Sequence, residues 1–325
     1  MQNLQSLLQN SQDFPPLEPS LELHWESPLE SPLESHLEPC VEPLKHPQGW
    51  TGLVFAIVCL LGWFLSLIFC LQFDFFGFPD FSSVQGLPGF LDLPSIQSLE
   101  KSLEILAAIG LRTFLQTGLF ILAHDAMHQS LFPHHLGLNH RLGSIALWCY
   151  GGLDYQQCCQ SHYHHHRHPG SDRDSDLSGK NAQILTWYFR FLSNYLSLKL
   201  FLKIIVNLGV LFLLAQGSPL SLSQDFWNLG LFYLLPLILS SWQLFIFGTY
   251  LPHRPIPGEP SLPHHSRSLA YPQWLSFLLC FHFGYHWEHH EYPYLPWYKL
   301  PLARQWSFQQ KSFPIPPSRE LESVL

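Results

Sequence analysis

The feature that most constrains this chain is a set of long apolar runs that carry almost no charge. The run 51–73 contains no charged residue at all. A helix needs about 20 residues to cross the hydrocarbon core of a bilayer, so this run predicts a transmembrane helix. Similar runs cover 103–123, 198–215 and 226–250, which predicts four membrane spans. The expected fold class is therefore an all-α polytopic membrane protein, because lipid requires backbone hydrogen bonds to close within each span.

The segments around these runs divide the chain into three predicted parts. Residues 1–49 contain SPLE-like repeats and are rich in Pro, Glu and Ser, which is typical of a disordered tail. Residues 50–310 form the expected membrane domain, and 311–325 form a C-terminal tail. Inside the membrane domain, the apolar segment 142–153 is too short to span. We expect this segment to lie in the membrane interface or to re-enter the membrane.

Four spans place the basic residues unequally on the two faces of the membrane. The loops 74–100 and 216–225 contain no Lys or Arg. The N-terminal tail, the loop 124–197 and the chain beyond 251 fall on the opposite face, which holds nearly all of the basic residues. The positive-inside rule makes that face cytoplasmic, with both termini inside.

The composition excludes several classes of protein and raises one question. Charged residues make up 12% of the chain, about half of the usual soluble share of about 25%. No basic stripe indicates a nucleic-acid partner. The seven cysteines form no CxxC pair, so neither a zinc ribbon nor a disulfide framework is predicted. The unusual feature is that 20 histidines outnumber the 16 Lys and Arg residues together.

Nine of these histidines fall in four motifs on the predicted cytoplasmic face. They are His124 and His128 in HDAMH, His162, His165 and His166 in HYHHH, His253 in FGTYLPHR, and His286, His289 and His290 in HWEHH. In a helix, offsets of three and four residues bring the imidazoles of one motif to one face, where they can converge on a metal. One ion takes about four to six nitrogen ligands, so nine imidazoles indicate two ions; neutral imidazole suits iron, zinc, copper or nickel.

Polar neighbours of these motifs have candidate roles of their own. Asp125 and Glu288 adjoin candidate ligands, and either carboxylate is a candidate to accept a proton from a ligand imidazole, which would fix its tautomer and raise its basicity. An ordinary capping or solvated role is the alternative for both. Four other histidines are expected to lie outside the site, namely His164 and His168 off the ligand face, and His264 and His265 in a solvated, Pro-rich loop.

At this point the chain resembles a known family. HxxxH and two HxxHH motifs at membrane helix ends resemble the membrane fatty acid desaturase and hydroxylase superfamily, whose members hold a non-haem di-iron centre in a histidine cage. More narrowly, HDAMH, FGTYLPHR and HFGYHWEHHEYP are similar to the β-carotene ketolases (4-oxygenases) of bacteria and algae. The resemblance implies that the nine histidines bind two Fe²⁺ ions, with His253 as the ninth ligand. HYHHHRH holds extra histidines, and the register at His162 is preferred because it alone produces HxxHH.

The resemblance also implies a reaction and its partners. The reaction would be an O2-dependent oxidation of the ring C4 methylene of β-carotene to a ketone through two hydroxylations, yielding echinenone or canthaxanthin, or astaxanthin from zeaxanthin. The carotenoid would enter from the membrane lipid. GxGxxG is absent from the chain, so electrons are expected from an external ferredoxin-type donor.

Several alternatives remain at the level of the sequence. Histidine spacing does not separate a ketolase from a carotenoid 3-hydroxylase, a fatty acid desaturase or an alkane hydroxylase. A divalent-metal transporter would also be His-rich and polytopic, but it needs ionisable ligands near the membrane midplane. Here Arg112 is the charge well inside the expected spans. A metalloprotease of the HExxH type is excluded because the motif does not occur.

Overall fold

The computed structural model describes residues 49–72, 96–171, 174, 176, 183–195, 197–215, 222–256 and 262–312. These residues form helices joined by turns, with an isolated β-bridge between Ser268 and Tyr285. The prediction of an all-α fold is therefore confirmed. The expected tail 1–49 lies, up to residue 48, outside the described residues, so its disorder stays a prediction.

Three helical stretches are long and apolar enough to cross a membrane, namely Trp50–Gln72, Leu99–Met127 and Gln224–His253. The first two belong to α3 (Gly49–Gln72) and α4 (Ile96–Met127). The third is a continuous series of short elements: α9 (Leu222–Leu229), η3 (Gly230–Leu234), α10 (Leu235–Leu244), η4 (Phe245–Tyr250) and α11 (Leu251–His253). Three of the four expected spans are thus confirmed by length and composition.

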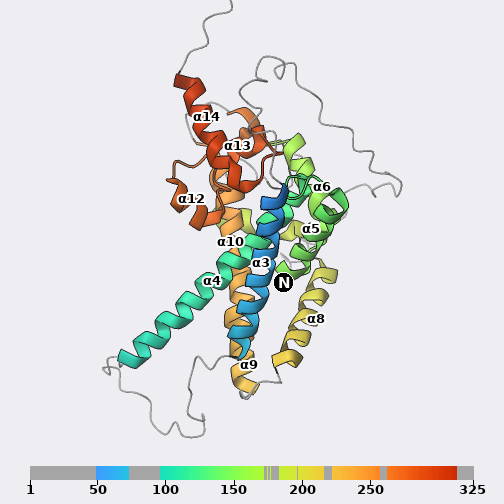
Figure 1. Cartoon of the computed structure of the whole chain (residues 1–325), viewed down its shortest axis with the longest axis vertical. Coiled ribbons are helices and arrows are strands. Elements are labelled where there is room, and N and C mark those ends of the chain that lie inside the picture. The colour runs from blue at the N-terminus through green and yellow to red at the C-terminus, as the bar shows by residue number, and fades with distance from the viewer. Residues whose placement is uncertain are drawn as a thin grey trace, which may run out of the picture. The chain divides into compact units, whose positions relative to one another are not determined.

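The remaining expected span corresponds to α8 (Leu198–Ala215). It qualifies only together with α7 (Ile184–Tyr195), and the two helices meet at an angle of 84°. This pair is either a broken span or a re-entrant segment. Figure 1 shows α8 running down to the end of the bundle where α9 begins. The chain therefore changes ends of the bundle between α6 and α9.

The outer faces of these helices are apolar. On α3, Val54, Val58 and Leu65 are 57%, 62% and 61% exposed. On α8, Phe201 and Val206 are 59% and 63% exposed. Contiguous apolar surface of this kind is unfavourable in water, and in a membrane protein it faces lipid.

A short helix, α5 (Leu136–Gly151), enters the bundle alongside α4. Near its start, Asn139 Nδ2 donates to the Ala126 carbonyl at 2.7 Å. Near its end, Gln116 donates to the Tyr150 carbonyl. Gln116 lies ten residues before Ala126 on α4, so α5 descends about 15 Å at 1.5 Å per residue. The segment 142–153 therefore runs into the bundle along α4, and its re-entry into the membrane stays a prediction.

The chain then returns to its starting level through α6 (Tyr155–Arg167). Gly152, with a φ of 79°, ends α5 in the left-handed conformation that favours glycine. Asp154 caps the start of α6. Toward the far end of α6, the Tyr163 hydroxyl donates to the Met127 carbonyl at the end of α4. The turn at Gly152 thus brings the histidines of α6 back to the end of α4.

Two π-helical turns interrupt the last span, and a proline follows each of them. Pro236 has no N–H to offer the carbonyl of Phe232, four residues earlier, and its ring would collide with that carbonyl in a regular α-helix. The π-turn η3 widens the helix at this point. Arg112, which is fully buried, donates from Nε to the Phe232 carbonyl at 3.0 Å. Pro252 stands in the same relation to η4 and carries His253 directly after it.

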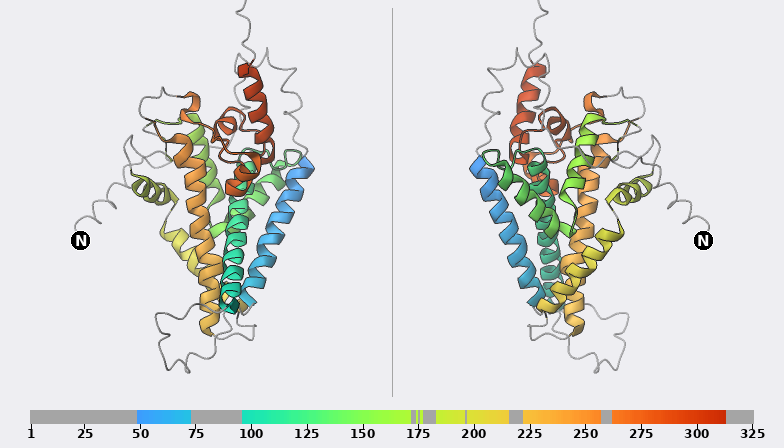
Figure 2. Two further views of the ribbon diagram at one scale, coloured as in Figure 1. Left: turned by 90° about the vertical axis from the view of Figure 1, so that its left-hand side faces the viewer. Right: turned by 90° about the vertical axis from the view of Figure 1, so that its right-hand side faces the viewer.

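The C-terminal elements lie over one end of the spans. They are η5 (Pro263–His265), α12 (Gln273–Cys280), α13 (His286–Glu291), η6 (Trp297–Lys299) and α14 (Leu300–Ser312). Figure 2 shows α14 beyond the ends of the membrane helices in both views. Between α12 and α13, Phe281 and His282 have positive φ values of 46° and 62°, which reverses the chain. This reversal turns the histidines of α13 toward α4 and α6.

Candidate metal centre

The nine candidate histidines all lie at the end of the bundle where α4 finishes. Eight of them form two groups, and within each group one nitrogen per ring lies within 4.8 Å of the others. We call His124, His128, His162 and His289 cluster one, and His165, His253, His286 and His290 cluster two.

Cluster one is built where α4, α6 and α13 meet. The Nε2 atoms of His128 and His162 are 2.7 Å apart. His124 is buried, and neither of its ring nitrogens has a hydrogen-bond partner. The rings of His124 and His289 lie 4.5 Å apart between centroids. Several lone pairs therefore point at a common centre.

Cluster two draws its histidines from α6, α11 and α13. The Nε2 atom of His290 lies 3.1 Å from Nε2 of His165 and 3.1 Å from Nε2 of His286. The Nε2 atom of His253 is buried without a hydrogen-bond partner. Four such nitrogens cannot all be satisfied by hydrogen bonds to one another, because a neutral imidazole carries a single N–H.

His166 is the ninth candidate and lies between the two clusters. Its Nε2 atom is 2.9 Å from Nε2 of His289 in cluster one. Its ring stacks on His290 of cluster two, with centroids 4.3 Å apart. The two clusters are therefore adjacent, and His166 contacts both of them.

The histidines of one sequence motif do not stay together. We expected the three imidazoles of HWEHH to converge on one point, but His286 and His290 join cluster two while His289 joins cluster one. Adjacent residues on an α-helix point about 100° apart, so His289 and His290 face different centres. The motif on α6 divides in the same way, with His162 in cluster one and His165 in cluster two.

The protonation states favour metal binding. Burial, together with the charge that neighbouring imidazoles would carry, lowers the pKa of most histidines in these clusters well below the usual value of free histidine. The affected residues outside the spans are His128, His162, His166, His286, His289 and His290. Neutral imidazoles with free lone pairs are the form that binds first-row transition metals. The donor set and its unpartnered buried nitrogens therefore fit two such ions.

A carboxylate that sequence reasoning missed orients one ligand candidate of cluster two. His165 Nδ1 lies 2.9 and 3.0 Å from the two carboxylate oxygens of Asp174. Burial opposes a charge on this ring, but the bond to Asp174 outweighs it, and the pKa of His165 is raised. The backbone N–H groups of Gly170 and Asp176 also donate to Asp174, each at 3.0 Å. The acidic stretch SDRDSD after HYHHH was the available signal.

The two carboxylates singled out from the sequence lie close to the clusters in different settings. Asp125 Oδ1 is 3.7 Å from His124 Nδ1, beyond hydrogen-bond distance, and Asp125 Oδ2 accepts from the Trp297 backbone N–H at 3.1 Å. Glu288 accepts from the Ser268 hydroxyl and, at 3.2 Å, from Arg304. Both carboxylates form hydrogen bonds to residues next to the segments that carry the histidines. Their role as proton acceptors for a ligand stays a prediction.

The histidines expected outside the site occupy two kinds of position. His164 and His168 are exposed and pack on each other, with centroids 5.0 Å apart. His265 is also exposed, but its backbone carbonyl accepts a hydrogen bond from His253 Nδ1 at 2.9 Å. His264 is only partly exposed and stacks on His290. The expectation of simple solvation is therefore too coarse for the loop that holds His264 and His265.

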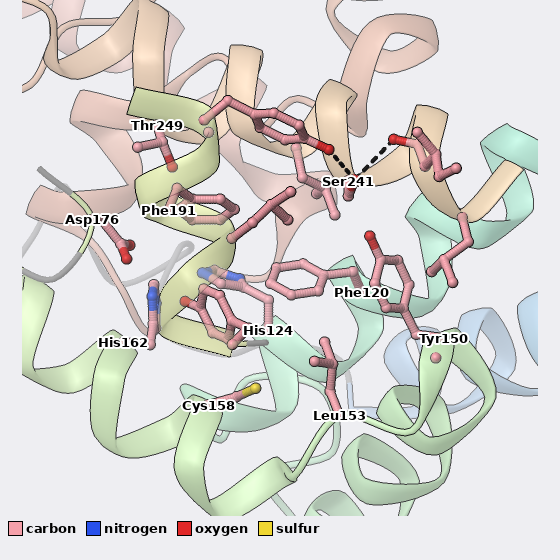
Figure 3. Close-up of a pocket in the computed structure, with 18 of the residues that line it drawn as sticks. Phe120, His124, Tyr150, Leu153, Cys158, His162, Asp176, Phe191, Ser241 and Thr249 are labelled. Atoms are coloured by element: carbon pink, nitrogen blue, oxygen red, sulfur yellow. Dashed lines mark hydrogen bonds between the residues drawn. The ribbon is translucent and has the colours of Figure 1, made fainter. Parts of the chain in front are cut away.

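An apolar cavity of about 550 Å³ opens onto both clusters. His124 and His162 of cluster one line it, as do His165 and His286 of cluster two. Figure 3 shows His124 and His162 beside aromatic side chains such as Phe120 and Phe191. The cavity walls come from α4 to α8, the last span and the turn before α13. Typical sites for apolar small molecules measure roughly 300–1,000 Å³, and this cavity falls within that range.

Two hydrogen-bonded hydroxyl groups lie in the otherwise apolar wall of the cavity. The hydroxyls of Tyr188 on α7 and Ser241 on α10 are 2.7 Å apart, and Ser241 also donates to the Ile238 carbonyl at 2.8 Å. Figure 3 shows both bonds at Ser241, on the edge of the cavity. Thr249, on the π-turn η4, also lines the cavity. A mostly apolar cavity with a few placed hydroxyls is typical of a site for a lipid-like molecule.

The chain matches the sequence model of the fatty acid desaturase family over residues 103–220 and 200–312. These two matches cover the helices that carry all nine histidines. The chain belongs to the fatty acid desaturase family.

Individual relatives of the chain make the family assignment more specific. The chain is 41% identical over 208 residues to a β-carotene ketolase of Paracoccus sp. (strain PC1), covering 62% of this chain and 80% of the relative. It is 39% identical over 231 residues to a β-carotene 4-ketolase of Protosiphon botryoides, covering 66% of this chain and 58% of the relative. A zeaxanthin 4-ketolase of Chlamydomonas reinhardtii is 41% identical over 195 residues, covering 59% of this chain and 42% of the relative. The resemblance to the β-carotene ketolases is thereby confirmed.

Proposed function

We propose that this membrane protein is a β-carotene ketolase that oxidises the C4 methylene of a β-ionone ring to a ketone. The observation that carries the proposal is the cavity, which is lined by apolar side chains and ends on imidazoles from both clusters. A carotenoid ring is apolar and enters from lipid, so this cavity suits it. The names of the relatives favour a ketolase over the 3-hydroxylase, desaturase and metal-transporter alternatives.

The residues of this chain would hold two iron ions, with cluster one and cluster two as the respective sites and His166 between them. When bound there, iron supplies the O2-activating chemistry that protein side chains lack. Asp174 holds the His165 ring by its Nδ1–H and leaves Nε2 directed to the centre of cluster two. The His265 carbonyl does the same for His253. Such partners fix the tautomer and the direction of the ligand ring.

The apolar wall of the cavity would position the ring and exclude bulk water from it. Phe283 packs edge-on against His124, with centroids 4.6 Å apart, and also lines the cavity. The ring of a substrate held against Phe283 would therefore lie beside cluster one. Each hydroxylation consumes O2 with a pair of electrons and protons and releases water, and loss of water from the resulting gem-diol leaves the ketone. The electrons would come from a ferredoxin-type carrier.

A carotenoid with a hydroxylated ring is a second candidate substrate, and the pair of hydroxyl groups in the cavity wall favours it. Tyr188 and Ser241 could hydrogen-bond a ring hydroxyl in a wall that is otherwise apolar. A relative that shares 41% identity is named as a zeaxanthin 4-ketolase. We infer that replacing Ser241 with Ala would reduce turnover of zeaxanthin more than turnover of β-carotene.

The membrane orientation is part of the same proposal. The histidine clusters would lie at the cytoplasmic face, together with both termini, as the positive-inside rule indicates. A cytoplasmic electron carrier could then reach them. Tagging each terminus and measuring its protection from protease in sealed vesicles would test this orientation.

The decisive test is expression of the full chain in bacteria that accumulate β-carotene, followed by chromatography and mass analysis of the pigments. Echinenone or canthaxanthin is the expected product. His286→Ala should abolish it, and His164→Ala, which changes an exposed histidine outside both clusters, should not. Formation of β-cryptoxanthin or zeaxanthin instead would move the oxidation to ring carbon 3. Unchanged β-carotene, from protein shown to contain iron and supplied with donor and oxygen, would refute the ketolase proposal.

A further inference from the structure

The loop Leu262–Ser268 lies over cluster two and is tied down on both sides. The His265 carbonyl accepts from His253 Nδ1 at 2.9 Å. The backbone N–H of Arg267 donates to the Pro252 carbonyl at 3.1 Å. Just beyond the loop, the N–H of Leu269 donates to the Gly284 carbonyl at 2.8 Å. These bonds hold the loop between α11 and the start of α13.

Two successive histidines of this loop adopt a backbone conformation that side chains rarely adopt. His264 and His265 have φ values of 56° and 45°, in the left-handed region. Such strain persists only where the surroundings impose it, and it is concentrated at functional sites. Part of the constraint comes from Gly170, where a Cβ atom would lie 2.4 Å from the Cγ of His265. Glycine at 170 therefore lets the loop close down on the end of α6.

This conformation places the His264 ring between solvent and cluster two. The side chain is 33% exposed, and its Nε2 atom is 2.7 Å from Oε2 of Glu291. On its inner side the ring stacks on His290, with centroids 6.0 Å apart and an interplanar angle of 21°. The cluster-two histidines themselves are at most 6% exposed. His264 therefore joins the protein surface to a buried ligand candidate through two parallel rings.

Three arginines belong to the loop itself or to the segments that contact it. Arg254 is exposed and follows His253 directly in the sequence, and Arg267 donates to the Arg254 carbonyl at 3.2 Å. Arg167 is exposed in the last turn of α6, close to the Gly170 turn on which His265 packs. Glu291, which pairs with His264, is an acidic group beside the ring. A rim of this kind attracts an acidic protein and accelerates its association.

We propose that His264 and the arginines around it form the docking and electron-entry site for an acidic one-electron carrier protein of the iron–sulfur class. This inference rests on the proposed function, because it assumes that cluster two binds a redox-active metal. Each encounter would oxidise the carrier by one electron, which would reach the metal site through the stacked rings of His264 and His290. Two encounters would supply the electron pair that one hydroxylation needs, and the accompanying protons would come from water.

The carotenoid and the carrier would then approach the centre from different sides. Apolar residues of α7, α8 and α10 line the cavity, which suits a lipid-soluble molecule. The His264 surface is polar and lies on the loop between α11 and α12, and His264 is not among the residues that line the cavity. Separate approaches would let the carrier bind while a substrate occupies the cavity.

The test measures the rate at which the iron-loaded full chain in lipid nanodiscs is reduced. After mixing with a reductant, the rate is monitored by the absorbance of the ferric form. Reduced [2Fe–2S] ferredoxin and dithionite are the two reductants. The first variant, His264→Asn, removes the ring, while asparagine tolerates the left-handed backbone. It should lower the limiting rate of reduction by ferredoxin at saturation and leave both reduction by dithionite and the iron content unchanged.

The second variant, Arg254→Glu with Arg267→Glu, should reduce the second-order rate with ferredoxin by about tenfold or more at low ionic strength, with a smaller loss at high salt. Its control is Arg141→Glu, which changes an exposed arginine on α5 and should react like the wild type. If His264→Asn keeps the wild-type limiting rate, or if the double variant behaves like the Arg141 control, the proposal is wrong. Because reduction is measured without carotenoid, failure of the ketolase proposal would not affect this result.

Discussion

Cluster one and cluster two are built from the same kind of side chain, yet their surroundings differ. In cluster two, His165 is bonded to Asp174 and His253 to the His265 carbonyl, so two of its rings have fixed acceptors on the side away from the centre. In cluster one, neither nitrogen of His124 has a hydrogen-bond partner, and Asp125 stays 3.7 Å away. The rings of cluster one are positioned instead by packing, including the contact between His124 and Phe283.

This difference indicates a division of labour between the clusters. Acceptors that hold a ligand ring raise its basicity and its affinity for a metal, so cluster two is expected to bind iron more tightly. Cluster one depends more on the shape of the cavity wall, since Phe283 lines the cavity and packs on His124 at 4.6 Å between centroids, closer than its 5.5 Å contact with His286 of cluster two. Changes in the wall should therefore disturb cluster one first.

The largest effect is expected from removing one ligand candidate from each cluster. His253→Ala should empty cluster two and His124→Ala should empty cluster one, each with loss of ketone formation and of about half of the bound iron if each cluster holds one ion. Iron per chain, measured by plasma mass spectrometry on purified protein, decides the matter. If either variant retains the full iron content, the two clusters are not separate sites as described.

A smaller effect on iron affinity should distinguish the carboxylate beside cluster two from the carboxylate beside cluster one. Asp174→Asn weakens the bond that orients His165, and partners of this kind contribute about 10–100-fold to metal affinity or activity. Asp125→Asn should cost less, because Asp125 is not within hydrogen-bond distance of His124. Iron dissociation in the presence of a chelator measures both. Equal losses in the two variants would remove the distinction between the clusters.

A change in the cavity wall should affect cluster one through packing. Gly248 lies on η4, and a Cβ atom there would come within 2.8 Å of the Phe283 ring. Gly248→Ala should therefore displace Phe283 and lower the rate of ketone formation, by about tenfold for a shift of well under 1 Å. Gly209→Ala on α8 is the matched control, because no atom outside its helix lies within 4 Å of the added Cβ. A Gly248→Ala variant as active as Gly209→Ala would show that Phe283 does not position the site.

The smallest effect concerns the stability of the metal-free protein as the pH changes. Burial lowers the pKa of His162, His286 and His289, so these rings are neutral when folded. Their contribution to stability is present above the unfolded histidine pKa of about 6.5 and is lost as the pH falls below it. His165 acts in the opposite direction, because its pKa is raised and its contribution is lost as the pH rises.

The lowered groups outnumber the raised one, so the Tm of the iron-free protein in detergent should fall between about pH 7.5 and about pH 5.5. Bound iron should shift the Tm upward at each pH, because ligands that bind only the folded state stabilise it. A Tm that rises on acidification would mean that the raised pKa of His165 dominates.

Much of the fold could be predicted from local patterns. The run 51–73 has no charge, and a helix of this length has few alternatives in lipid. The length of 142–153, which is apolar but too short to span, left both an interfacial and a re-entrant position open, and only the tertiary contacts show it running along α4. The bend of 84° between α7 and α8 was missed because the apolar run 198–215 was interpreted by itself as one span, without the helix that precedes it. The π-turns before Pro236 and Pro252 had a local signal in the prolines, whereas the bond from Arg112 to the Phe232 carbonyl in the first π-turn joins residues far apart in the sequence.

The candidate site was predictable in membership but not in arrangement. Spacings of three and four residues placed eight of the nine histidines on one side of their helices, a local property of helical geometry, while His253 stands alone in its motif. Asp174 was missed because it lies nine residues after His165, outside the helix that carries the motif, and contacts it only in the folded chain. His264 was assigned to solvent because its stacking on His290 joins segments that are 26 residues apart in sequence.

The sequence by itself determined that this chain crosses a membrane as helices and gathers its histidines at one end of them. Those properties follow from the length of apolar runs and from the period of the α-helix, both of which act over a few residues. Only the tertiary structure decided how eight of the histidines divide between two clusters with His166 between them, which carboxylate orients His165 and where the surface meets the site. The angle at which α13 approaches α4 and α6 controls that division, because adjacent histidines on a helix point about 100° apart. That angle results from long-range packing.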